Sequence, residues 1–101
     1  MANTFKNSPS QVGTSPVDVY TVPAATTAVV IGLMIANITA AQIEVDIQAA
    51  GKYLGKGVPI PAGSSLSALD GKLVLLTTEK ITVTSDTAAS ADVLVSYMEI
   101  T

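Results

Sequence analysis

Two neighbouring carboxylates are the side chains of this chain best placed to do chemistry. Glu44 and Asp46 alternate with Ile43, Val45 and Ile47, so both carboxylates fall on one face of an expected strand. Such a pair can act as acid and base, or can bind a cation. No third acidic residue lies close to them in the sequence, and no aromatic floor of the kind that sugar sites use accompanies them. We therefore expect a solvent-facing strand, and we predict no catalytic residues and no metal ligands.

The other motifs that suggest chemistry are incomplete. The glycine-rich segment Gly51 to Gly57 resembles a phosphate loop, but it lacks the G-x-x-x-x-G-K-[ST] spacing. Asn37-Ile38-Thr39 matches the N-glycosylation pattern, yet the polar N-terminus shows no export signal. Serines are plentiful, but no S-x-x-K spacing offers a lysine as their base. None of these motifs predicts a site, and we expect no cofactor.

The composition argues against an enzyme and against a nucleic-acid partner. Hydrophobic residues make up 49% of the chain and charged residues 13%, and His, Cys, Trp and Arg are all missing. General acid–base catalysis near neutral pH most often uses His, and thiolate chemistry needs Cys. A net charge of −3, with five scattered lysines, lacks the basic patch that binds phosphates. The missing Cys also excludes a disulfide scaffold.

The length fits one domain preceded by an arm. At 101 residues the chain is long enough for a single core. Residues 1–16 are polar and contain Pro9, Gly13 and Pro16, which predicts an extended N-terminal arm lying against another surface, such as a second subunit. Residues 17–101 form the expected β-sandwich domain. The stretch from Val19 to Ile43 has no charge and could span a bilayer, but its proline and its polar residues favour strands, and we expect no membrane partner.

Short apolar runs broken by Pro and Gly predict strands throughout that domain. Ala28 to Ala36 is apolar on both faces, which predicts a central strand covered from both sides, with Gly32 marking either a bulge or a close approach of another backbone. Gln42 to Gln48 alternates strictly, so one face should meet the core and the other solvent. Gly51 to Pro61 reads as a loop or an irregular strand at a sheet edge, because two prolines interrupt it. The remaining strands are expected at Val17–Val22, Ser65–Leu69, Lys72–Leu76, Ile81–Thr84 and Ala91–Thr101, with Asp70-Gly71 as a tight hairpin turn.

This pattern predicts an all-β protein. About seven or eight strands at spacings of roughly ten residues indicate an antiparallel β-sandwich, and both an immunoglobulin-like and a jelly-roll strand order fit them. Tyr20 and Tyr97 fall in the first and last strands, where they should help to close the core. Tyr53, in the glycine-flanked loop, is the aromatic residue expected to be exposed, either as a contact anchor or as part of the loop packing.

Several segments carry a family resemblance. They are Val19-Tyr-Thr-Val-Pro-Ala-Ala-Thr-Thr-Ala-Val-Val-Ile-Gly-Leu33, Ala36-Asn-Ile-Thr39, PIPAGSSL (59–66), DGKLVL (70–75) and the closing stretch 92–100. Together these segments resemble small virion structural proteins of tailed bacteriophages. The resemblance covers residues 18–101 and includes no catalytic signature. It implies a β-sandwich present in many copies on a phage particle, which acts through its surfaces.

The resemblance leads to one expected function and two alternatives. We expect a non-enzymatic capsid decoration or cement protein of the virion, assembled in the host cytoplasm. Its partners would be the major capsid protein or tail proteins and further copies of itself. A tail, neck or baseplate subunit is the first alternative. A carbohydrate-binding adhesion module is the second, although the chain has no Trp and few aromatic residues to stack on sugars.

Overall fold

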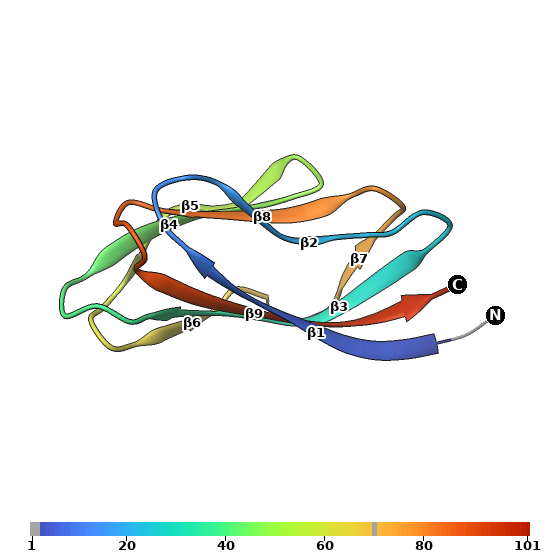
Figure 1. Ribbon diagram of the computed structural model, residues 1–101, viewed down its shortest axis with the longest axis horizontal. Helices are drawn as coiled ribbons and strands as arrows, with labels where there is room; N and C mark the ends of the chain where they lie inside the picture. The colour runs from blue at the N-terminus through green and yellow to red at the C-terminus, as the bar shows by residue number, and fades with distance from the viewer. Residues whose placement is uncertain (1–2, 70) are drawn as a thin grey trace.

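The computed structural model describes residues 3–69 and 71–101 and contains two antiparallel sheets that pack face to face (Figure 1). The all-β sandwich expected from the sequence is confirmed. One sheet has five strands and the other has four, so the described residues form nine strands. The strands are β1 (Asn3–Val12), β2 (Val17–Thr21), β3 (Thr27–Asn37), β4 (Ile43–Ala49), β5 (Lys52–Ile60), β6 (Ser65–Ser67), β7 (Leu73–Leu75), β8 (Lys80–Ser85) and β9 (Ala91–Ile100).

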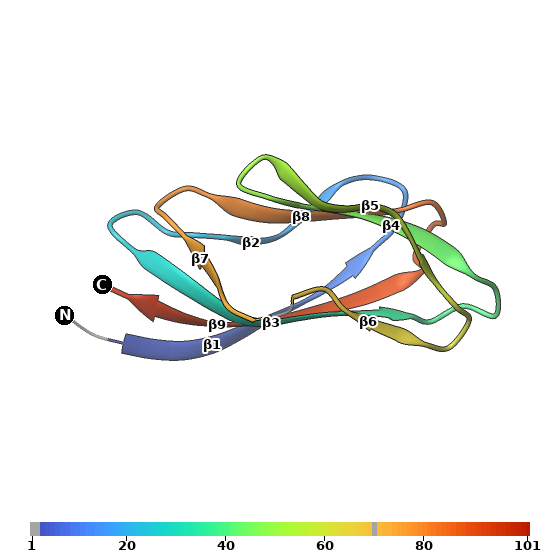
Figure 2. The same cartoon turned by 180° about the vertical axis from the view of Figure 1, so that it is seen from behind.

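The strand pairs are nested around a central hairpin, and this nesting identifies the fold. β4 pairs with β5, β3 with both β6 and β7, β2 with β8, and β1 with β9. One long antiparallel ribbon is thus rolled into two sheets, with orders β1-β9-β3-β6 and β2-β8-β4-β5. This is the jelly-roll order, so the choice that the sequence left open is decided against the immunoglobulin-like one. The start of β1 and the end of β9 lie side by side at one end of the sandwich (Figures 1 and 2).

Most of the expected strands are present, and one expected hairpin is wrong. Gln42 to Gln48 corresponds to β4, with Ile43, Val45 and Ile47 buried as its alternation predicted. The segment with the two prolines forms β5, which is an edge strand of the four-stranded sheet. The expected hairpin of Ser65–Leu69 with Lys72–Leu76 does not form, because β6 and β7 pair with different parts of β3. Asp70, half of its expected turn, lies outside the described residues.

The N-terminal segment belongs to the sandwich over most of its length. The expected arm, residues 1–16, is an edge strand over residues 3–12: β1 pairs with β9 in an unbroken ten-residue register from Asn3–Ile100 to Val12–Ala91. The surface that orders it is this chain's own sheet. The polar side chains of this segment show no apolar alternation from which a strand could be predicted. The strand forms because backbone groups supply the ladder hydrogen bonds, while most of its side chains stay exposed.

The core lies between the sheets and is built from the inward side chains of β2, β3, β4, β8 and β9. Leu33, Ile35 and Ile81 are fully buried there. The charge-free run from Val19 to Ile43 folds as β2, a turn and β3, and no helix able to cross a membrane occurs in the described parts of the chain. β3 is central, and its ladder to β9 shifts register between Val30 and Gly32, where either a bulge or a close backbone approach was expected.

The outward side of β3 differs from the prediction. Ile31 and Met34 are 46% and 42% exposed, so this strand is covered on one face only. The apolar pattern correctly predicts a central position, but no element within residues 3–69 and 71–101 covers its second face.

Candidate functional site

The carboxylate pair on β4 has structural partners. Glu44 is exposed, and Asp46 is half-buried on the outer face of the four-stranded sheet. The Oδ1 atom of Asp46 accepts a 2.7 Å hydrogen bond from the backbone N–H of Gly57, which ties β4 to an irregular part of β5. The backbone N–H of Glu44 donates to Oδ1 of Asp86 at 3.2 Å. No group of three or more potential metal ligands gathers within residues 3–69 and 71–101.

The glycine-rich segment forms a hairpin. Ala49 pairs with Lys52, so Ala50 and Gly51 make a two-residue turn, with φ angles of 51° and 80°. Two left-handed residues in succession match the twist of the flanking strands. Gly51 therefore allows the backbone conformation that this turn requires. The segment begins no helix that could hold a phosphate.

The glycosylation motif is part of the interior. Asn37 is 2% exposed. Its Nδ2 atom donates to the carbonyl oxygens of Ala41, Ile60 and Pro61 at 2.7, 2.9 and 3.2 Å. Its Oδ1 atom accepts from the N–H and the hydroxyl of Thr39. The amide nitrogen to which a glycan would be attached donates hydrogen bonds to three backbone carbonyls. This side chain therefore connects loops inside the fold.

A buried acidic residue near the chain ends was not anticipated. Glu99 on β9 is 6% exposed, and its two carboxylate oxygens accept hydrogen bonds from Lys6 Nζ at 2.9 Å and from Tyr20 Oη at 2.7 Å. These donors hold the pKa of Glu99 below its ordinary value, the lysine bond being the larger cause. The Glu99 bond in turn raises the pKa of Lys6.

The two tyrosines close the core, as the sequence predicted. Tyr20 and Tyr97 are buried and stacked, with ring centroids 3.9 Å apart. Burial raises the pKa of both phenols, and the carboxylate of Glu99 adds to the effect. With the carboxylate of Glu99 paired to Lys6 and to Tyr20, the geometry fits a structural clasp among β1, β2 and β9.

Tyr53 lies beside a polar hollow on the outer face of the four-stranded sheet. The ring is 51% exposed, and Lys56 Nζ lies 4.9 Å from its centroid, so a cation covers one face of the ring. The hollow has a volume of about 320 Å³, and Asp46, Gln48 and Thr82 are among its lining residues. It is small and polar, and its lining contributes no second aromatic ring.

The most distinctive surface of the molecule is the outer face of the five-stranded sheet. Cross-strand partners share a face, so the register places their outward side chains in rows across β1, β9, β3 and then β6 or β7. One row is Phe5, Met98, Val29 and Val74; the next is Asn7, Ser96 and Gly32; the third is Pro9, Leu94, Met34 and Ser67; the fourth is Gln11, Asp92, Ala36 and Ser65.

This face combines apolar character with very little charge. Phe5 is 70% exposed and Val74 58%, and Ile31, Met34 and Leu94 exceed 40%. Among its outward positions in the described strands, Asp92 alone carries a charge. The opposite sheet, by contrast, presents Asp18, Glu44, Asp46 and Lys80. Exposed apolar side chains gathered on one nearly uncharged face are typical of an interaction surface.

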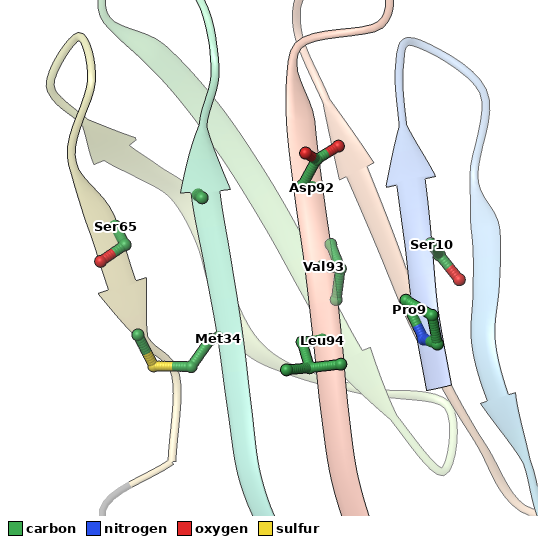
Figure 3. Close-up of a pocket in the computed structure, with 8 residues that line it drawn as sticks. Pro9, Ser10, Met34, Ser65, Asp92, Val93 and Leu94 are labelled. Atoms are coloured by element: carbon green, nitrogen blue, oxygen red, sulfur yellow. The ribbon is translucent and has the colours of Figure 1, made fainter. Parts of the chain in front are cut away.

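One end of this face is hollowed (Figure 3). The open hollow has a volume of about 590 Å³. Figure 3 shows Met34 on β3 and Leu94 on β9 side by side, with Pro9 on β1 beyond them. The surface is recessed here because small side chains, Ala36 and Ser65 among them, occupy this end of the sheet. The lining residues are Pro9, Ser10, Met34, Ala36, Ser65, Asp92, Val93 and Leu94.

Sequence reasoning missed this face, although a signal for it was present. In β9 the buried set is Ala91, Val93, Val95 and Tyr97, so Leu94 and Met98 fall on the opposite face. Apolar residues at both parities of the two central strands indicate a second covered face. They do not tell whether this chain or another molecule provides the cover.

Comparison with known proteins gives a fold and no family. No protein-family model and no curated protein matches this sequence. A solved structure from the Bacillus endospore appendages, described as a family of disulfide-linked pili, has a similar fold, with a TM-score of 0.58 at 10% identity. The match covers 99% of this chain and 87% of that one. At such identity the likeness concerns the fold alone, and this chain has no Cys with which to form a disulfide link.

Proposed function

We propose that this protein is a non-enzymatic structural component of a bacteriophage virion, present in many copies, and that it decorates or cements the capsid. The observation that carries the proposal is the outer face of the five-stranded sheet, which leaves five large apolar side chains more than 40% exposed with one charge among them. Such a face favours protein–protein contact and offers no means to bind a phosphate or a metal.

Three further findings support this function. The sheets follow the jelly-roll order, which viral capsid domains also use. The similar solved structure belongs to an appendage whose description names it a pilus, itself a structural assembly. The residues that first suggested chemistry, Asp46, Asn37 and the glycines near Gly51, have turn-forming or bridging roles in this fold.

Localisation on particles tests the proposal directly. An antibody raised against the purified protein would be used for immunogold electron microscopy of phage particles purified from the source of the sequence. Gold on heads is the expected result. Gold confined to tails, necks or baseplates would select the alternative location within the virion. Particles that lack both label and peptide by mass spectrometry would refute the virion assignment.

The adhesion alternative rests on the hollow beside Tyr53. Asp46 and Gln48 in its lining are residue types that bind sugar hydroxyls. Lys56 covers the ring face that a sugar would stack on, which disfavours this function. Binding on a glycan array that Tyr53→Ala abolishes would revive it.

A further inference from the structure

We propose that the outer face of the five-stranded sheet binds a second copy of this chain, in a two-fold dimer whose axis runs across the strands near Ser96. The inference deepens the proposed many-copy structural role and rests on it.

The sheet edges favour a contact through faces over one through strand addition. β1 contains Pro9, which has no N–H to donate, and β5 contains Pro59 and two register shifts. β6 and β7 are three residues each, and the β2 ladder is also irregular. Prolines, bulges and short strands are the devices by which proteins prevent edge-to-edge pairing. The open faces are therefore the surfaces left for self-association.

The charge distribution selects which face meets its copy. The chain has a net charge of −3, so two copies repel each other at most orientations. The outward rows of the five-stranded sheet carry one charge, Asp92, at one end of the face. A copy docked there avoids like-charge contact over the remaining rows. A copy docked on the four-stranded sheet would have to desolvate Asp18, Glu44, Asp46 and Lys80, a cost that the other face avoids.

The apolar rows of the face meet each other after a two-fold rotation. Phe5 and Val74 are 70% and 58% exposed and share a row with Met98, and the row of Pro9, Leu94 and Met34, which borders the hollow, lies two rows away along the strands. The row between them is Asn7, Ser96 and Gly32, which has the small side chains at its centre. Rotation about an axis parallel to this middle row places the row of Phe5, Met98 and Val74 of one copy against the row of Pro9, Leu94 and Met34 in the other, so apolar side chains meet apolar side chains. Each copy then supplies both halves of the contact, as an isologous interface requires.

The face is large enough for a stable dimer. Strands of ten residues are about 33 Å long, and four strand positions span about 19 Å, which gives a planar footprint of roughly 600 Å². A standard interface buries about 800 Å² of accessible surface per partner. Side-chain relief raises the accessible area above the planar footprint, so the two areas are of the same order. Residues Ser96 and Gly32 allow the backbones to approach closely at the centre.

The test is the mass of the purified full-length protein in solution, measured by light scattering and by sedimentation equilibrium. We expect a dimer. Leu94→Asp would place a carboxylate in the contact twice and should weaken dimerisation by about a hundredfold. The matched control is Leu54→Asp on β5, because Leu54 is 44% exposed against 42% for Leu94. The control should remain a dimer, and circular dichroism would establish that both variants are folded.

A second measurement serves if Leu94→Asp unfolds. The chain has no Cys, so Ser96→Cys introduces a single thiol at the expected axis. A short bis-maleimide reagent should link two copies through it. Thr82→Cys, equally half-buried on the outer face of the other sheet, should give no linked dimer.

The outcomes separate this inference from the proposed function. A wild-type protein that is still monomeric at about 0.1 mM would overturn the dimer, because a Kd above that concentration means only weak association. So would dissociation by Leu54→Asp with no effect of Leu94→Asp, or linkage through Thr82→Cys alone. Gold on phage heads together with a monomer would refute the dimer and leave the virion role standing. A dimer of a protein absent from particles would do the reverse.

Discussion

Removing one hydroxyl group should measurably weaken the clasp at the chain ends. Tyr20→Phe deletes the 2.7 Å hydrogen bond to Glu99 and keeps the ring that stacks on Tyr97 at 3.9 Å. A hydrogen bond to a buried charged group contributes about 1.5–3 kcal/mol, so the free energy of unfolding should fall by about 2 kcal/mol. For a domain of this size each kcal/mol lowers Tm by about 4–8 °C. Urea titration at pH 7 and a thermal scan measure both effects.

The pH dependence provides a second readout of the same bond. Because the folded pKa of Glu99 lies below its ordinary value of 4.5, the unfolded chain binds a proton there that the folded chain does not. The contribution of Glu99 is therefore fully present above that value and is lost as the pH falls through the folded pKa. In Tyr20→Phe the pKa is lowered less, so this part of the loss of stability in acid should be smaller.

Tyr53→Phe is the matched control for this experiment. Tyr53 is 51% exposed and its hydroxyl has no hydrogen bond in the described structure, so its removal should change stability by less than about 0.5 kcal/mol. Equal stability losses for the two variants, or an unchanged acid slope in Tyr20→Phe, would refute the role assigned to the Glu99 clasp.

Three further predictions follow from single features of the fold. Asn37→Ala leaves buried carbonyls without donors and should lower the free energy of unfolding by about 2–3 kcal/mol in urea titration, whereas a loss below 0.5 kcal/mol would contradict its bridging role. A chain shortened to begin at Val17 loses β1 and uncovers the edge of β9, so it should unfold at lower temperature and aggregate in light scattering; an unchanged Tm would contradict the place of β1 in the sheet. Gly51→Ala puts a side chain at a φ of 80° and should cost about 1–2 kcal/mol, which Gly63→Ala at a φ of 68° should match.

The local pattern predicted those elements whose side chains alternate. Ile43, Val45 and Ile47 face the core because successive residues in a strand point to opposite sides, and that rule needs no knowledge of the partner strand. The prolines near β5 predicted an edge because a proline removes one ladder donor. The bulge at Gly32 was one of two predicted alternatives, since a glycine inside an apolar run weakens a regular ladder.

Elements whose stability comes from distant partners could not be predicted in the same way. β1 has almost no apolar pattern, and it is a strand because β9 offers ten unpaired backbone positions about ninety residues away. β6 and β7 looked like a hairpin because they are close in sequence, but β3 is long enough to pair with both. Glu99 follows the inward parity of β9, yet its acceptability there depends on Lys6 and Tyr20.

The sequence by itself determined the fold class, the two-sided apolar character of the central strands and the absence of His, Cys, Trp and Arg. These properties depend on residue type and on the period of two along each strand. Only the tertiary structure decided the jelly-roll order, the partners of Glu99 and Asn37, and the exposure of the face around Leu94. Those properties depend on which strands meet, and backbone hydrogen bonds between strands are the same for every residue except proline.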